Sequence, residues 1–119
     1  MRAKGAVLRL GPKRAQETIL VEGYATGLSV EMAVRQMRLS AAVLICFSDA
    51  NLVSVASQVR GRAYCFADND ESGAGQRAAE KTGLPYCMAD TVGFDANDEH
   101  KKNGLMAVCQ RLTKVRRMQ

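Results

Sequence analysis

Short apolar runs alternate with stretches of mixed character along the 119-residue chain. The apolar runs have the length of strands, and the most continuous of them, AVLICF, is typical of a strand buried on both faces of a parallel sheet. Gly11 and Pro12 close the first run with a turn signal. We predict strands over residues 6–10, 18–22, 42–47, 62–67 and 86–89.

The stretches between these runs place apolar residues three and four positions apart, which is the spacing of one face of a helix. Gly83 ends one such stretch and Pro85 follows it, as is common at helix C-termini. Because strands and helices alternate, the pattern predicts an α/β domain with a mostly parallel sheet and helices on both of its faces. We predict helices over residues 26–37, 51–59, 72–82 and 105–115, and a loop over 91–97.

The composition is that of a single globular domain. Hydrophobic residues make up 47% of the chain and charged residues 24%, which argues against a disordered chain. No apolar run approaches the roughly 20 residues that cross a bilayer, and the N-terminal sequence is a poor secretory signal, so we expect a cytoplasmic protein without membrane contact. The four cysteines form no CxxC pair and there is one histidine, so we expect free thiols rather than a zinc site or disulfides.

Charges are unevenly distributed along the chain, whose net charge is +5. Basic residues concentrate towards both ends, whereas acidic residues concentrate between residues 68 and 99. The positive net charge favours a polyanionic partner. A basic chain that gathers its acidic residues in one segment is consistent with a cation site inside an anion-binding surface.

Ligands of parallel α/β sheets bind at the carboxyl ends of the strands. Glu22 ends a predicted strand and is followed by Gly23, which allows close approach of backbone or ligand and unusual backbone dihedral angles. From this segment alone, an acidic residue in an ordinary turn is the simpler interpretation. The residues that follow the predicted strands are Glu22, Ser48, Asp49, 68–72 and 90–98.

Asp68 and Asp70 follow the predicted strand over 62–67 and share one face of an extended chain. Two carboxylates about 5 Å apart repel by roughly 3 kcal/mol at an effective dielectric constant near 20. A divalent cation turns this repulsion into attraction, and Mg²⁺ is commonly held by one or two carboxylates together with substrate phosphates. The structural alternative is that Asp68 caps the following helix while Asp70 is solvated. Two carboxylates at this spacing after an apolar strand favour the metal site.

The last predicted loop offers further oxygen ligands at Asp95, Asn97 and Asp98. A metal-ligating role and a structural role, as a polar loop that caps a final helix, are equally open here. The segment GAGQRA at 73–78 matches the dinucleotide fingerprint, but the three acidic residues just before it would repel a pyrophosphate. No GxxxxGK[ST] phosphate loop occurs, so ATP hydrolysis by the chain alone is not expected. His100 stands among charged residues and is expected to be exposed.

Three segments resemble, in this order, the Toprim family, the domain shared by bacterial primases, topoisomerases and related nucleases: ILVEGYATGLS, FADNDESGAGQRAAEKTG and GFDANDEHKKNG. The EGYAT and FDAND motifs are most similar to primases of phages, plasmids and primase-helicase chains. The resemblance implies a Rossmann-like α/β fold with a four-stranded, mostly parallel sheet flanked by helices, to which this chain adds a short N-terminal strand. It also implies one Toprim domain over residues 1–119, with its core at about 17–115, as a fragment of a larger primase or a stand-alone unit.

The resemblance implies roles for individual residues as well. Glu22 would be the catalytic acid/base or charge-positioning group, with Gly23 beside it. The metal-binding positions fall on Asp68, Asp70 and Asp95, with Asn97 and Asp98 as additional site residues. The basic residues expected to hold template or triphosphate are Lys13, Arg14, Arg77, Lys101 and Lys102.

The activity implied is that of a DNA primase, in which Mg²⁺, or Mn²⁺ in its place, assists attack of a 3′-hydroxyl on a nucleotide α-phosphorus. Expected partners are single-stranded DNA template, nucleoside triphosphates and a replicative helicase domain, and the isolated domain is expected to be a monomer. The alternatives are a metal-dependent nuclease of the same family and a non-catalytic nucleic-acid-binding module. Thr26 is a departure, because many replicative primases carry a second carboxylate there, and it bears on whether two metals bind.

Overall fold

The computed structural model describes residues 7–118, and over this range the chain forms five strands and five helices. In chain order these are β1 (Leu8–Leu10), β2 (Glu17–Val21), α1 (Tyr24–Gln36), β3 (Ala41–Ile45), α2 (Asp49–Ala56), β4 (Arg62–Ala67), α3 (Ala74–Thr82), β5 (Tyr86–Met88), α4 (Ala96–Asn103) and α5 (Leu105–Arg116). The first predicted strand is confirmed over Leu8–Leu10, and its predicted start at Ala6 lies outside the described residues.

The strands form one mixed sheet in the order β1-β3-β2-β4-β5. Strands β2 to β5 are parallel to one another, and β1 pairs antiparallel with β3 at one edge. The register between β2 and β3 sets Glu17 opposite Ala41 and Val21 opposite Ile45. This arrangement confirms the predicted α/β fold, with four parallel strands and a short additional N-terminal strand.

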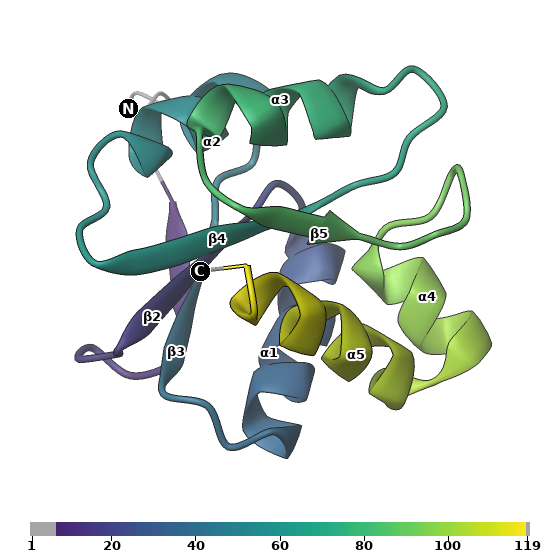
Figure 1. The fold of residues 1–119 in the computed structure, drawn as a ribbon, viewed down its shortest axis with the longest axis horizontal. Coiled ribbons are helices and arrows are strands. Elements are labelled where there is room, and N and C mark those ends of the chain that lie inside the picture. The colour runs from purple at the N-terminus through teal and green to yellow at the C-terminus, as the bar shows by residue number, and fades with distance from the viewer. Residues whose placement is uncertain (1–6, 119) are drawn as a thin grey trace.

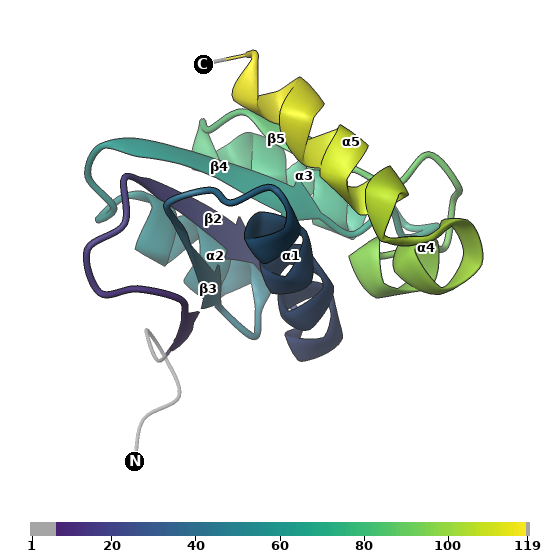
Figure 2. The same ribbon diagram turned by 90° about the horizontal axis from the view of Figure 1, so that it is seen from below.

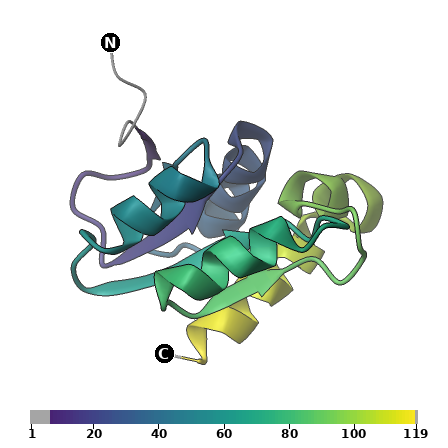
Figure 3. The same cartoon turned by 90° about the horizontal axis from the view of Figure 1, so that it is seen from above.

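Helices cover both faces of the sheet (Figure 1). Helices α1, α4 and α5 lie on one face, as Figure 2 shows, and α2 and α3 lie on the other, as Figure 3 shows. The alternation of side chains along a strand explains how the central strands serve both layers. Ile19 and Val21 of β2 pack into the cluster beneath α1 and α5, whereas Leu20 between them packs into the cluster beneath α2 and α3.

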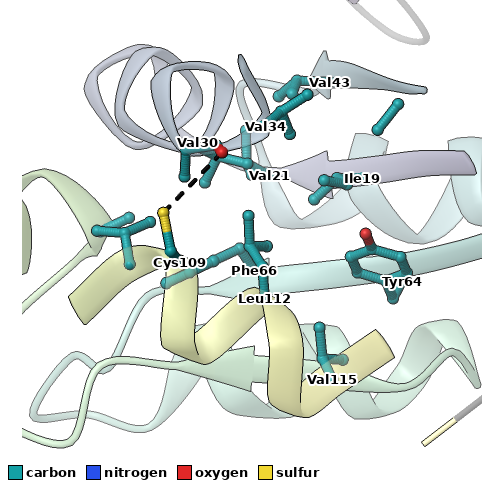
Figure 4. Packing of buried hydrophobic residues seen from close by; sticks show 14 of the residues in the cluster. Ile19, Val21, Val30, Val34, Val43, Tyr64, Phe66, Cys109, Leu112 and Val115 are labelled. Carbon is teal, nitrogen blue, oxygen red and sulfur yellow. Dashed lines mark hydrogen bonds between the residues drawn. The ribbon is translucent and has the colours of Figure 1, made fainter. Parts of the chain in front are cut away.

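The larger core lies between the sheet, α1 and α5 (Figure 4). Tyr64 and Phe66 of β4 are fully buried there and face Leu112 and Val115 of α5. The Cys109 thiol contacts the Ala33 carbonyl of α1 across this core, at 4.0 Å. Burial of large side chains on both faces of the central strands accounts for their continuous apolar sequences.

Helix α4 was not predicted, since the expected loop ended at residue 97 without a helix after it. Its sequence, ANDEHKKN, has almost no apolar periodicity. Glu99 is nevertheless buried, and it accepts two hydrogen bonds from Arg111 of α5, at 3.2 and 3.0 Å. His100 is half-buried, and the prediction of an exposed side chain is wrong, because its Nδ1 lies 3.2 Å from the Ser29 hydroxyl of α1.

Two further sequence expectations concern membranes and thiols. None of the helices within residues 7–118 is both long enough and apolar enough to cross a membrane.

The four cysteines are free, and three of them are buried, whereas Cys87 is only partly buried. The expectation of free thiols is therefore confirmed.

Candidate active site

The acidic residues singled out in the sequence gather at one edge of the sheet. Because β2 to β5 are parallel, their carboxyl ends lie on the same side, where Figure 1 shows β4 and β5 running towards α4. Glu22 follows β2, and Asp68 and Asp70 follow β4. Asp49 begins α2 after β3, and Asp95 caps α4. The strand-end rule thus placed these carboxylates on the correct side of the molecule.

Glu22 is half-buried at this edge. Loss of hydration raises the pKa of its carboxyl group to about 7, and repulsion from Asp49, Asp68 and Asp70 contributes further. The carboxylates of Asp49, Asp68 and Asp70 thus all act on the Glu22 carboxyl group. The structure therefore brings the predicted catalytic residue together with the predicted metal pair.

Asp68 is also half-buried and connects two segments of the site. Burial raises the pKa of its carboxyl group to about 6, and Asp95 is the carboxylate that adds most to this rise. Thr26 opposes it, since its buried hydroxyl donates a hydrogen bond to Oδ1 of Asp68 at 3.2 Å. Position 26 thus supplies a hydroxyl donor to Asp68 and no further carboxylate.

Asp70 lies in the turn that leads into α3. Its Oδ1 accepts a hydrogen bond from the backbone nitrogen of Gly75 at 3.1 Å. Gly73, with a φ of 76°, has the left-handed conformation that turns the chain into the helix. A carboxylate therefore occupies the positive end of α3, where a dinucleotide phosphate would otherwise lie, so the glycine fingerprint at 73–78 has a structural role here.

Gly75 is a point of close approach between α3 and β4. A Cβ atom added at Gly75 would overlap the carbonyl oxygen of Asp68. By contrast, Gly23 has ordinary extended dihedral angles and no atom within 4 Å of an added Cβ. The unusual backbone expected at Gly23 is therefore absent, and the conformational freedom of glycine is used at 73 and its small size at 75.

Asp49 is a member of the site that the sequence placed at the sheet edge without naming it as a functional residue. Its Oδ1 is buried and makes no hydrogen bond within residues 7–118. Ser48 rather than Asp49 caps α2, through a hydrogen bond from the Asn51 nitrogen at 3.1 Å. The Asp49 carboxylate is thus not needed for the helix cap. The sequence signal for Asp49 was its position directly after the predicted apolar strand AVLICF, at the edge where ligands bind.

Asp95 and Asp98 form a reciprocal cap at the start of α4. The Asp98 nitrogen donates to the Asp95 carboxylate at 2.8 Å, and the Asp95 nitrogen donates to the Asp98 carboxylate at 3.0 Å. Asn97 accepts a hydrogen bond from Ser29 at 3.4 Å. The structural role left open for this segment is therefore present. Asp95 also repels the Asp68 carboxylate, and its metal-ligating role stays a prediction.

The basic residues predicted to contact nucleic acid lie in two different places. Arg77 is exposed on α3 and lines a cavity of about 530 Å³ that also contains Asp49 and Lys81. Lys101 and Lys102 are exposed on α4, the helix that Asp95 caps.

Lys13 and Arg14, by contrast, precede the amino end of β2. The five residues of this strand, about 16 Å in length, separate them from Glu22. The structure does not bring these two residues to the carboxylates, and their contact with nucleic acid stays a prediction.

The donor atoms of this edge suit a hard divalent cation. Carboxylate oxygens are the ligands that Mg²⁺ prefers, and Mg²⁺ usually keeps several waters and uses one or two carboxylates plus substrate phosphates. No three His, Cys, Asp or Glu side chains within residues 7–118 are arranged to hold one metal ion by themselves. The mutual repulsion around Glu22 and Asp68, together with the unpaired buried oxygen of Asp49, is what a bound cation would relieve. The residues therefore fit a Mg²⁺ site that substrate phosphates complete.

A family model described as Toprim domain matches residues 17–105, from the start of β2 to the start of α5. The comparisons with curated proteins and with solved structures returned no match. The matched region covers three quarters of the chain and contains every carboxylate of the site. The chain therefore belongs to the Toprim family.

Proposed function

We propose that this chain is the catalytic domain of a DNA primase, which makes RNA primers on single-stranded DNA by Mg²⁺-dependent nucleotidyl transfer. Toprim domains occur in primases, topoisomerases, nucleases and recombination proteins, and they are commonly catalytic and generally bind Mg²⁺. The observation that carries the proposal is the convergence of carboxylates from four segments of the chain at one sheet edge. The EGYAT and FDAND motifs support the primase branch of the family.

In this proposal Asp68 and Asp70 hold Mg²⁺ together with phosphate oxygens of the nucleotide. The bound ion would supply charge neutralisation at the reacting phosphate. Thr26 fixes the orientation of Asp68 through its hydrogen bond to Oδ1. Glu22, at the end of β2, would accept the proton of the attacking 3′-hydroxyl at a carboxylate oxygen.

The cavity between α2 and α3 offers a place for the phosphate chain. Arg77 and Lys81 line it, one turn apart on α3, and it reaches Asp49 at the carboxylate edge. The Arg77 guanidinium is held by a hydrogen bond to the Ser72 carbonyl at 2.8 Å. Two cations beside the acidic site would bind phosphate with an affinity that falls as salt rises.

The proposal is tested by incubating the protein with single-stranded DNA template, labelled nucleoside triphosphates and Mg²⁺. We expect oligoribonucleotide product, and we expect Asp68→Asn to lower its rate by about 100-fold or more, because the remaining carboxylates hold the ion and orient the phosphate less well. Glu71→Gln is the matched control, since Glu71 is an exposed acid in the same loop. It should retain the wild-type rate.

Other outcomes would contradict the proposal. Shortening of the template with no synthesis would identify a metal-dependent nuclease that uses the same carboxylates. Binding of nucleic acid with neither product would identify a non-catalytic module. Equal activity of the Asp68→Asn and Glu71→Gln variants would remove the metal assignment even if primers are made.

A further inference from the structure

The exposed aromatic side chains of this protein lie beside Glu22. The chain has three tyrosines, three phenylalanines and no tryptophan, and all six aromatic residues lie in the described part of the chain. Tyr24 is 53% exposed and Phe47 is 55% exposed, whereas the other four are buried or half-buried. Tyr24 begins α1, two positions after Glu22. The backbone nitrogen of Phe47 donates to the Glu22 carbonyl at 2.8 Å.

Phe47 also has an unusual backbone. Its φ of 69° lies in the left-handed region, which bulky residues rarely adopt, and within residues 7–118 the only other non-glycine residue with a positive φ is Arg38. Glycine or asparagine would meet the turn between β3 and α2 at lower cost. The Phe47 side chain is exposed and contributes little to the core, so packing does not explain the strained backbone. Strain of this kind is concentrated at functional sites.

We propose that Tyr24 and Phe47 form a platform on which bases of a single-stranded nucleic acid stack while the adjoining phosphate lies at the carboxylate edge. This inference rests on the proposed nucleic-acid function of that edge. Stacking on aromatic rings tolerates any base, because every base has a flat π-face, and it requires bases that are not stacked in a duplex. The platform therefore selects single strands over duplexes.

A protein partner is the competing occupant, since Leu28 and Met32 extend the apolar surface from Tyr24 along α1. The surroundings of Phe47 favour bases. The central parts of protein interfaces are depleted in charged residues, and here the aromatic pair flanks Glu22, which Asp49 and Asp68 already repel. A strand of nucleic acid would place the apolar faces of its bases on the two rings. Its phosphates, with their bound cations, would lie at the carboxylates.

The test uses the whole chain and a single-stranded oligodeoxynucleotide that carries 2-aminopurine, in Mg²⁺ at fixed ionic strength. Stacking should quench the fluorescence of the base. Phe47→Gly should weaken binding on the order of tenfold, and Tyr24→Ala should do likewise. Neither change should alter binding of an abasic oligonucleotide of the same length, which keeps the phosphates. Phe47→Trp should retain the affinity.

Stability separates this effect from misfolding. Phe47→Gly removes the left-handed strain, so its melting temperature should equal or exceed that of the wild type. Arg38→Gly is the matched control for strain relief, because Arg38 has a φ of 56° at the far end of α1. Met106→Ala is the control for an exposed apolar side chain, since Met106 is 61% exposed on α5. Both controls should quench 2-aminopurine as the wild type does.

Several results would overturn the platform. The wild type could fail to quench the fluorescence, or both aromatic variants could keep the wild-type affinity. The variants could also lose as much affinity for the abasic oligonucleotide as for the normal one. Finally, the wild type could be a dimer that Phe47→Gly dissociates.

Primer synthesis measured in parallel distinguishes the failure of this proposal from the failure of the proposed function. Quenching without primers would leave the platform and refute the primase, whereas primers made equally well by wild type and by Phe47→Gly would refute the platform alone.

Discussion

Thr26 shows how a single side chain sets the charge balance of the site. It is buried, and its hydroxyl donates to Asp68 while Asp49, Asp70 and Asp95 all repel that carboxylate. A carboxylate at position 26 would add a further negative charge to this group. A hydroxyl instead stabilises the ionised form of Asp68 and keeps its Oδ1 in one orientation. We therefore interpret Thr26 as a positioning residue for Asp68.

Replacing Thr26 by valine tests this interpretation. Valine keeps the shape and the burial but removes the donor, so we expect the affinity for Mg²⁺ to fall by roughly tenfold, the effect of losing a hydrogen bond to a metal ligand. Isothermal titration with Mg²⁺ measures it. Thr26→Ser keeps the hydroxyl and should bind Mg²⁺ nearly as the wild type does. If valine and serine variants bind equally well, Thr26 fills space and does not position Asp68.

At the scale of secondary-structure elements, the sequence predicted those strands and helices that have a clear apolar pattern. The buried strands β3 and β4 were predicted within two residues of their observed ends, because continuous apolar runs are needed on both faces of the sheet. Helix α4 was missed, since it is short and highly charged, and its signal was the Asp95–Asp98 capping pair rather than a hydrophobic face. The close contact between α3 and Asp68 could not be predicted from the sequence either, because it depends on the distance between two elements.

The start of α3 offers a test of that approach. Gly75→Ala would place a Cβ atom against the Asp68 carbonyl oxygen, which is backbone and cannot rotate away. We expect it to lower the free energy of unfolding by about 1–3 kcal/mol, and to weaken Mg²⁺ binding because Asp68 is displaced. Gly23→Ala is the matched control for stability, since an added Cβ there meets nothing. Equal melting temperatures for the two variants would contradict the close contact.

At the scale of the whole molecule, the two ends of the parallel strands differ in how their carboxylates are paired. The carboxyl edge gathers carboxylates that repel one another. At the amino edge, buried Glu17 of β2 accepts hydrogen bonds from Arg116 at 2.6 Å and from the Tyr64 hydroxyl at 2.7 Å, with Arg62 at 3.4 Å. No local pattern could reveal this cluster, because its members come from β2, β4 and α5. One edge thus supports stability and the other is available for ligands.

The amino-edge cluster predicts a pH dependence of stability. Its hydrogen bonds, chiefly from Arg116, hold the pKa of Glu17 below the ordinary value of 4.5. The stabilisation is therefore complete above about pH 4.5 and is lost as the pH falls through the lowered pKa. Glu17→Gln should cost about 2–3 kcal/mol at neutral pH, towards the low end for buried pairs because the arginines are partly exposed. The difference in the free energy of unfolding between wild type and Glu17→Gln should become smaller at acidic pH.

Urea unfolding of both proteins from pH 7 to pH 3 measures the difference. Glu31→Gln provides the control, since its ion pair along the helix is with the exposed Arg35 and is long, at 3.7 Å. It should change stability by less than about 0.5 kcal/mol at every pH. A gap between wild type and Glu17→Gln that stays constant down to pH 3 would show that the charge of Glu17 is not the source of the stabilisation.

The bond between Glu17 and Arg116 joins residues 99 positions apart. A ribosome that adds about 5–20 residues per second needs roughly 5–20 s to pass from one to the other. During that interval the first strand of the parallel sheet has been made, but the helix that covers it and neutralises its buried carboxylate has not. We therefore expect the nascent chain to expose the apolar face of β2 and β3 and to engage chaperones until α5 has emerged, so that the domain acquires its protease resistance only after the last helical turn is synthesised.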